Sequence, residues 1–251
     1  MIDLSGQHIL IIGGSRGIGR ATALMAAQAG ADVSIHYARD KAAAKEVSAQ
    51  VRALGRKAIE VCADVLDEKA MNLATQEAIE ALGPLSGLVV SAGIFEPAPL
   101  GEMTTEFWDQ MINTNLRGTF FAVRAAAPSL RSRKRGSIVI LTSTAGQRGS
   151  AVYSAYATSK GGQIMFMRSM AQELAADRIR VNCVAPGWTL TDMSRDTMEK
   201  LGMDDIIKKA PLGRIGKPED PAAATCFLLS DIAEFITGST ITVDGGMDMR
   251  G

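Results

Sequence analysis

Near its start the chain reads Gly13-Gly14-Ser15-Arg16-Gly17-Ile18-Gly19, directly after the apolar run His8–Ile12 and before a helical pattern that extends from Arg20 to Gln28. Glycines in such a turn let the backbone approach a pyrophosphate, and the free N–H groups and dipole of the following helix favour an anion. The spacing is Gly-x-x-x-Gly-x-Gly, whereas the common dinucleotide-binding turn has Gly-x-Gly-x-x-Gly. The strand, turn and helix together predict a phosphate-binding site, and a plain tight turn is the alternative.

Short apolar runs alternate with longer helical patterns along the whole chain. We expect strands at 8–12, 33–37, 57–61, 86–90, 137–142, 179–184 and 239–243, and helices near 17–29, 40–54, 67–82, 105–130, 153–176 and 218–230. Runs such as Ile138–Leu141 are apolar without alternation, which is typical of strands covered on both faces. The alternation therefore predicts an α/β fold, a single Rossmann-type domain over 1–251 with one doubly wound parallel sheet of about seven strands.

In such a sheet, ligands bind beyond the carboxyl ends of the strands. Gly13, Ser91, Ser143 and Pro186 each follow a predicted strand, so we expect them at one edge of the sheet.

Tyr156 and Lys160 are separated by four positions, and Ser143 lies thirteen positions before the tyrosine. On a helix, residues i and i+4 share a face, so an ammonium group would lie beside a phenol. A neighbouring positive charge lowers the pKa of a phenol from its usual value near ~10, which predicts a tyrosine able to exchange a proton at neutral pH. The alternative is a surface tyrosine with a solvated lysine. Tyr153 has the wrong spacing to Lys160, and we expect it to line the substrate entrance or to pack.

Taken together, these motifs resemble the short-chain dehydrogenase/reductase family over nearly the whole chain. The family's glycine motif matches Gly13, Gly17 and Gly19, and its catalytic tetrad matches Asn115, Ser143, Tyr156 and Lys160. A Pro-Gly motif matches Pro186-Gly187 with Thr191 downstream, and Val243-Asp244-Gly245-Gly246 also fits. The resemblance is greatest to the branch that contains the 3-oxoacyl-[acyl-carrier-protein] reductases and many other carbonyl reductases.

The resemblance implies a role for each member of the tetrad. Tyr156 would be the general acid in carbonyl reduction, and Lys160 would lower its pKa and bind the nicotinamide ribose. Ser143 would hold the carbonyl oxygen, and Asn115 would position a water that links Lys160 to solvent. The resemblance also implies a homotetramer in which the helices near 105–130 and 153–176 pack in a dimer interface.

The end of the second predicted strand bears on the choice of cofactor. An NAD site usually has an acidic residue there for the ribose 2′-hydroxyl, whereas this chain has Tyr37-Ala38-Arg39, with Asp40 placed to cap the next helix. Arg39 and Arg16 could hold a 2′-phosphate, so NADP(H) is favoured over NAD(H). Asp64-Val65 is expected to meet the adenine. The other residues expected at the cofactor are Ser15, Ile18, Ser91, Ala92, Gly93, Pro186, Gly187, Thr189 and Thr191.

The segment 188–217 is the least regular part of the sequence. It contains Trp188, Met193, Met198 and several other apolar residues. Apolar side chains on a movable segment suit a lid that excludes water, so we expect Trp188, Met193 and Met198 to line an apolar pocket, with Ser143 and Tyr156 also contacting the substrate. A packed surface helix pair is the alternative.

Bulk composition narrows the class of protein. Lys+Arg and Asp+Glu are equal at 27 each, which predicts no general attraction to nucleic acid or to an anionic membrane. The basic cluster Arg131–Arg135 is interpreted as a solvated loop, with a docking patch for an acidic carrier protein as the alternative. Cys62, Cys183 and Cys226 are widely spaced, and we expect buried thiols in a reducing compartment with no disulfide or zinc site. With only two histidines, no metal site is expected. Because no apolar stretch is long enough to span a membrane, no membrane segment is expected, and we expect a cytoplasmic location.

The favoured function is reduction of a ketone, such as a 3-oxoacyl thioester, by NADPH. An NAD-dependent alcohol or polyol dehydrogenase working in the oxidative direction is the first alternative. A non-catalytic dinucleotide sensor is the second, and the complete tetrad argues against it because a sensor needs no proton relay.

Overall fold

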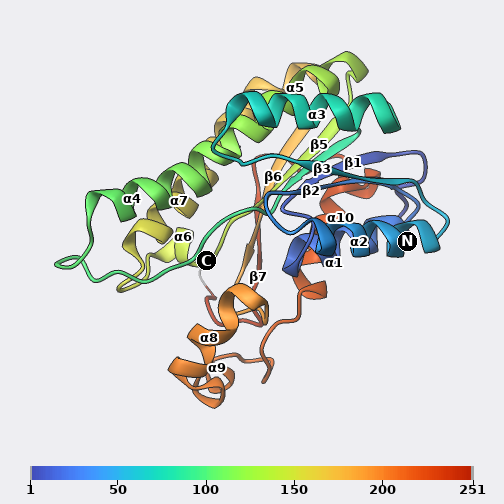
Figure 1. The fold of residues 1–251 in the computed structure, drawn as a ribbon. Coiled ribbons are helices and arrows are strands. Elements are labelled where there is room, and N and C mark those ends of the chain that lie inside the picture. Colours follow the sequence, from blue (N-terminus) through green and yellow to red (C-terminus); the bar gives the residue numbers. More distant parts are fainter. Residues whose placement is uncertain (1, 250–251) are drawn as a thin grey trace.

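Seven parallel strands form one sheet in the computed structural model, which describes residues 2–249 (Figure 1). Met1, Arg250 and Gly251 of the expected 1–251 domain lie outside the described residues. The strands are β1 (His8–Ile12), β2 (Asp32–Tyr37), β3 (Ala58–Cys62), β4 (Gly87–Val90), β5 (Gly136–Leu141), β6 (Ile179–Pro186) and β7 (Thr240–Val243), in the order β3-β2-β1-β4-β5-β6-β7. The predicted Rossmann-type doubly wound sheet is confirmed.

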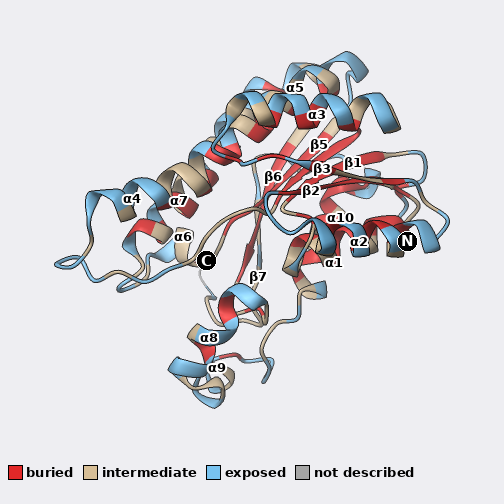
Figure 2. Cartoon of the chain, in the orientation of Figure 1, coloured by how far each residue is buried: buried red, intermediate tan, exposed pale blue. Residues whose placement is uncertain are grey.

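Helices cover both faces of the sheet because successive strand residues point to opposite sides. Leu10 and Ile12 of β1 belong to one buried apolar cluster, which contains residues of α3 (Glu68–Leu82), α5 (Gly118–Arg133) and α7 (Ser154–Glu173). Ile9 and Ile11 belong to a second cluster, with α1 (Gly17–Gln28), α2 (Lys41–Ala53) and α10 (Glu219–Leu229). Figure 2 shows the central strands and the sheet-facing sides of these helices as buried, whereas no residue of β7 is buried. Continuous apolar strands are therefore explained by burial on both faces.

The strand order reverses direction between β1 and β4. From β1 the chain proceeds outward to β2 and β3, and from β4 it proceeds the other way to β7. A parallel sheet has its ligand crevice at the carboxyl ends of the strands beside this reversal. The glycine turn after β1 and the segment Ser91-Ala92-Gly93 after β4 both lie there.

One predicted helix is interrupted. The expected helix over 105–130 consists of α4 (Thr105–Ile112), a π-helical turn η1 (Asn113–Arg117) and α5. Sequence periodicity does not reveal the interruption, because the π turn depends on contacts that residues of η1 make with distant segments. Such π turns are frequent at functional sites, and this one contains Asn115.

Short helices occupy two segments that the sequence left without regular structure. The helix α6 (Ala145–Arg148) follows Ser143, while α8 (Asp192–Leu201) and α9 (Met203–Lys208) lie within 188–217. In Figure 1 the pair α8–α9 projects from the carboxyl side of the sheet. The remaining 3₁₀ turns are η2 (Ala175–Asp177) and η3 (Asp231–Ala233).

Candidate active site

The glycine turn after β1 is held by hydrogen bonds to His36 of β2. Gly13 has a positive φ of 78°, and a Cβ added to it would lie 2.7 Å from the backbone nitrogen of Ala92, so only glycine fits. The Gly14 N–H donates to the His36 carbonyl at 2.9 Å, and the Gly13 N–H donates to His36 Nδ1 at 3.2 Å. Burial lowers the pKa of His36 to about 4, which keeps the imidazole neutral and Nδ1 able to accept. His36 was not expected at the site from the sequence.

The first turn of α1 suits a bound anion. Its N-cap residue Arg16 makes no side-chain capping hydrogen bond, and no acidic residue stands in the first turn. By contrast, the side chains of Asp40, Asp67 and Thr104 cap α2, α3 and α4. The N–H groups of α1 therefore face a site with no protein acceptor from the N-cap side chain, which fits the pyrophosphate of a dinucleotide.

A cavity of about 230 Å³ lies beside this turn. Arg16, Arg20 and Arg195 contribute positive charge to its wall, and Asp192 and Glu219 contribute negative charge. Thr191 meets the turn from the other side, since a Cβ on Gly17 would lie 3.4 Å from Thr191 Cγ2. The segment after β6 thus reaches the predicted phosphate site.

The end of β2 has no acidic residue facing the cofactor crevice. Tyr37 is buried, Ala38 and Arg39 are exposed, and Asp40 accepts from the Ala43 N–H at 2.9 Å. Asp40 therefore caps α2, as predicted. Arg39 has no hydrogen-bond or ion-pair partner within residues 2–249, so its guanidinium can take an anionic group.

The remaining cofactor candidates lie along the same edge. Asp64 Oδ1 accepts from the Leu66 N–H at 3.0 Å, and Val65 packs against Gly118, where an added Cβ would lie 3.0 Å away. The Ser91 N–H donates to the Ile12 carbonyl at 2.9 Å. Ser15 and Ile18 lie in or just after the glycine turn, Gly93 lies against Asn115, and Pro186, Gly187 and Thr189 follow one another at the end of β6.

Tyr156 and Ser143 line a cavity of about 160 Å³ at the carboxyl ends of β5 and β6. The two side chains are hydrogen-bonded, which lowers the pKa of Tyr156, but the larger effect is burial, which raises it to about 12. We expected Lys160 to lower this pKa, and the structure gives the opposite direction. The reason is that burial of the phenol dominates, while Lys160 Nζ lies 5.8 Å from the centre of the Tyr156 ring.

Lys160 is itself buried, with its ammonium group donating to the Leu141 carbonyl at 2.8 Å. Burial disfavours the charged form and lowers the pKa of Lys160 to about 8. The group therefore carries a positive charge at neutral pH and loses it under mildly alkaline conditions.

The side chain of Asn115 connects three segments. Its Oδ1 accepts from the Ile94 N–H at 2.8 Å, and its Nδ2 donates to the Ile94 carbonyl at 3.0 Å and to Ser159 Oγ at 3.0 Å. Its backbone carbonyl accepts from Thr119 Oγ1 at 2.6 Å and from Gln163 Nε2 at 2.9 Å. The side chain that was expected to position a water thus holds the loop after β4 against α7.

An aromatic wall beside Tyr156 lines the cavity. Phe95 stacks on Tyr153 with ring centres 4.7 Å apart, and it meets Tyr156 and Trp188 edge-on at 4.9 Å and 6.1 Å. Tyr153 lines the cavity, in agreement with one of its two predicted roles. Phe95 was missed, although its position shortly after Ser91-Ala92-Gly93, at a strand's carboxyl end, was a usable signal.

Two expectations about apolar and sulfur-containing residues are wrong. Trp188 and Met193 line the cavity, but Met198 is fully buried within its surroundings and does not. Cys183 and Cys226 are buried as expected, whereas Cys62 is exposed at the end of β3. All three thiols are free.

Similar proteins identify the family. A family model described as enoyl-(acyl carrier protein) reductase matches residues 13–248. The chain is 38% identical to a 3-oxoacyl-[acyl-carrier-protein] reductase from Synechocystis sp., over 99% of this chain and 100% of that protein. The chain belongs to the short-chain dehydrogenase/reductase family.

Further relatives in this family carry other names. An L-rhamnose 1-dehydrogenase (NAD(P)(+)) from Sphingomonas sp. is 37% identical over 97% of both chains. A solved structure from Sinorhizobium meliloti, provisionally assigned as a short-chain alcohol dehydrogenase, has a TM-score of 0.94 and 37% identity, covering 98% of each chain. Like these short-chain dehydrogenases/reductases, the protein is an oxidoreductase that acts on CH–OH or C=O groups with NAD(P).

Two negative findings apply to the described residues. Within 2–249, no three His, Cys, Asp or Glu side chains are grouped so that they could hold a metal ion. None of the helices in that range is long and apolar enough to cross a bilayer.

Proposed function

We propose that this enzyme uses NADPH to reduce a ketone to a secondary alcohol, with a 3-oxoacyl thioester or a related carbonyl compound as substrate. The observation that carries the proposal is the shared cavity in which the hydrogen-bonded pair Tyr156 and Ser143 faces an aromatic wall. A cavity with a few convergent polar groups in an apolar surround is typical of a small-molecule site.

Tyr156 is the proposed proton donor. With a pKa raised to about 12 by burial, its phenol keeps its proton at neutral pH and can give it to a carbonyl oxygen. The Ser143 hydroxyl holds that oxygen and stabilises the charge that develops on it. The buried ammonium of Lys160 favours the phenolate that remains after transfer.

The cofactor would lie along the carboxyl edge of the sheet, where its nicotinamide supplies the hydride when bound. Gly13, Ser15, Gly17 and Ile18 would hold the pyrophosphate, with Thr191 opposite. Arg16 and Arg39 would hold a 2′-phosphate through charge-assisted hydrogen bonds, which favours NADP(H) over NAD(H). This preference is supported by the lack of an acidic side chain at the end of β2 that is not already capping a helix.

An NAD-dependent alcohol or polyol dehydrogenase is the second candidate. It is favoured by the relative named L-rhamnose 1-dehydrogenase, since the same tyrosine can accept a proton in the reverse direction. A homotetramer and a cytoplasmic location belong to the same proposal.

Recognition of an acyl-carrier protein would use another surface than Arg131–Arg135. Arg131 pairs with Asp177 at 3.0 Å, and Arg135 pairs with Asp231 at 2.6 Å. The cluster also stands before the amino end of β5, whereas the cavity lies beyond its carboxyl end.

The test is a screen of NADPH and NADH oxidation with acetoacetyl thioesters, diketones, quinones and cyclic ketones. NADPH-dependent turnover of at least one ketone is expected. Turnover seen only as alcohol oxidation with NAD⁺ would favour the second candidate, and no turnover in either direction would overturn both.

A further inference from the structure

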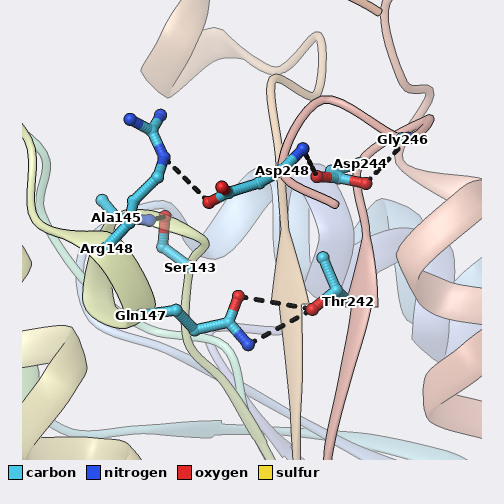
Figure 3. A network of polar contacts seen from close by, with 8 residues as sticks. All are labelled: Ser143, Ala145, Gln147, Arg148, Thr242, Asp244, Gly246 and Asp248. Carbon is cyan, nitrogen blue, oxygen red and sulfur yellow. Dashed lines mark hydrogen bonds and ion pairs between the residues drawn. The ribbon is translucent and has the colours of Figure 1, made fainter. Parts of the chain in front are cut away.

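A charged pair lies in the wall of the cavity that contains Tyr156. Arg148, the last residue of α6, and Asp248, in the C-terminal segment, both line this cavity. Arg148 Nε lies 2.9 Å from Asp248 Oδ2 (Figure 3). Among the described residues that line the cavity, these two alone are charged.

The pair is built into the fold. Asp244 accepts from the Gly246 N–H at 2.9 Å and from the Asp248 N–H at 2.8 Å, which turns the C-terminal segment back toward α6. Gln147, beside Arg148, exchanges hydrogen bonds with Thr242 of β7 at 3.2 and 3.3 Å. The pair therefore has a defined position relative to β7.

The same helix is tied to the reaction centre. The Ala145 N–H at the start of α6 donates to Ser143 Oγ at 3.1 Å. Arg148 thus stands one short helix away from the hydroxyl proposed to hold the reacting oxygen, and the distance between these two groups is set by α6.

Arg148 has hydrogen-bonding capacity left. Its pairing with Asp248 uses Nε, and Figure 3 shows the terminal nitrogens directed away from that carboxylate. Within residues 2–249 these terminal nitrogens have no hydrogen-bond partner. The Arg148 side chain is 40% exposed, so a ligand in the cavity can reach its guanidinium, and the Asp248 side chain beside it is 10% exposed.

The chemistry of the pair indicates which group it selects. A hydroxyl both donates and accepts, so it can take a hydrogen bond from the guanidinium and give one to the carboxylate. A ligand carboxylate would gain from Arg148 but would be repelled by Asp248, and an apolar chain end would desolvate both charges without replacing their hydrogen bonds.

We propose that Arg148 and Asp248 are specificity-determining residues that select a carbonyl substrate bearing a hydroxyl group at its far end from the reacting carbon. This rests on the proposed function and narrows its substrate class. The aromatic wall of Phe95, Tyr153 and Trp188 packs against the carbon skeleton of the substrate, and the charged pair hydrogen-bonds its hydroxyl group.

The experiment uses the full chain and a series of ω-hydroxy-2-ketones of increasing length. Each is compared with the 2-ketone that carries a methyl group in place of the hydroxyl, and with the keto acid of the same length. The measured quantity is the ratio of kcat/KM values within each set, from NADPH and NADH oxidation. At the best length, the parent enzyme is expected to prefer the hydroxy compound over the methyl compound by about 10- to 100-fold, as hydrogen bonds to charged groups give.

Two variants test the pair, one for each partner. Arg148→Met should lower the hydroxy-to-methyl ratio by about tenfold or more, because the donors are lost. Asp248→Asn keeps the shape, removes the repulsion, and should raise the keto-acid-to-hydroxy ratio by about tenfold. If Arg148→Met does not fold, as judged by thermal unfolding, Asp248→Asn still tests the proposal.

Arg135→Met is the matched control. It breaks an exposed Arg–Asp pair near the amino end of β5, and both ratios should stay at the parent values. Equal use of hydroxy and methyl ketones by the parent, or unchanged ratios in both test variants, would overturn the inference while leaving the proposed reductase intact. Failure to reduce any ketone, including an acetoacetyl thioester, would overturn the proposed function itself.

Discussion

Tyr156 is half-buried at the cavity, with Ser143 hydrogen-bonded to it and Lys160 at 5.8 Å from its ring. The phenol and the ammonium respond to the same burial in opposite directions: the pKa of Tyr156 rises to about 12, and that of Lys160 falls to about 8. Burial disfavours the charged form of each group. At neutral pH, the site therefore holds a proton on Tyr156 and a positive charge on Lys160.

Replacing Tyr156 by phenylalanine removes the proposed acid and leaves the ring in place. Turnover should fall by about 100-fold or more, the lower range for general acid catalysis, while the cofactor Kd stays within about twofold. Steady-state kinetics and NADPH fluorescence titration measure the two quantities. Turnover within about threefold of the parent would contradict the assignment.

Arg39→Asp tests the cofactor preference at the end of β2. A carboxylate there repels a 2′-phosphate and accepts from a 2′-hydroxyl, so the NADPH-to-NADH ratio of kcat/KM should fall by about tenfold or more. Lys45→Asp, on an exposed position of α2, makes the same change in net charge and serves as control. A parent that already prefers NADH would show that Tyr37 and Arg39 were misinterpreted.

At the scale of elements, short segments between the strands shape the site. The π turn η1 contains Asn115, whose side chain hydrogen-bonds Ile94 and Ser159. Trp188, which precedes α8, and Met193, which lies in α8, both line the cavity. Both interpretations of the segment 188–217, a lid and a packed helix pair, therefore have support in its geometry, and kinetics can separate them.

Trp188→Ala removes part of the aromatic wall beside Phe95. Burial of a large aromatic side chain is worth roughly 1.5–3 kcal/mol, so kcat/KM for the ketone should fall by about 10- to 100-fold with little change in cofactor Kd. Leu212→Ala, at an exposed position of the same segment, is the control. A lower unfolding temperature with unchanged kinetics would mean that Trp188 only packs, and the lid hypothesis would be dropped.

At the scale of the whole molecule, two buried histidines, His8 of β1 and His36 of β2, lie within the sheet. Burial lowers the pKa of His8 and lowers that of His36 from 6.5 to about 4. Their neutral forms take part in hydrogen bonds that connect strands and turn: His8 with Ser34 and Gly83, and His36 with Gly13. These contacts link proton uptake to global stability.

Stability should decline as pH falls from about 6.5 toward 4. In that window the unfolded chain binds a proton on His36 and the folded chain does not, so protonation stabilises the unfolded state and lowers the free energy of unfolding. Above pH 6.5 the neutral His36 makes its full contribution to stability. The loss from His36 at pH 5 is roughly 2 kcal/mol. Urea unfolding at pH 7 and pH 5 measures it, and His36→Gln should flatten the dependence. Equal stability of the parent at the two pH values would contradict the prediction.

Assembly is the second property at this scale. Phe120 on α5 and Met165 on α7 are 38% and 52% exposed, on the helices expected to form a dimer interface. We expect a tetramer by light scattering, and Phe120→Glu should lower the mass because a charge in an apolar interface is costly. Leu73→Glu, at an exposed position of α3, should not change the mass. A monomeric parent would end this expectation.

The sequence alone was sufficient for the sheet and for the residues along its carboxyl edge. Strand and helix periodicity are local properties, and burial on both faces leaves an unbroken apolar run such as Ile138–Leu141 that can be read without a structure. Residues that directly follow a parallel strand lie at the carboxyl edge of the sheet, which is why the sequence predicts Gly13, Ser143 and Pro186 at that one edge.

Only the tertiary structure decided the features that depend on distant contacts. The π turn at Asn115, the place of Phe95 and the meeting of Arg148 with Asp248 each join segments far apart in the chain, and no local period encodes them. The direction of the Tyr156 pKa shift has the same origin. Spacing predicts Lys160 on the same helix as Tyr156. Packing around the site decides how much water is excluded from the phenol, and it places the Leu141 carbonyl where it accepts a hydrogen bond from the Lys160 ammonium.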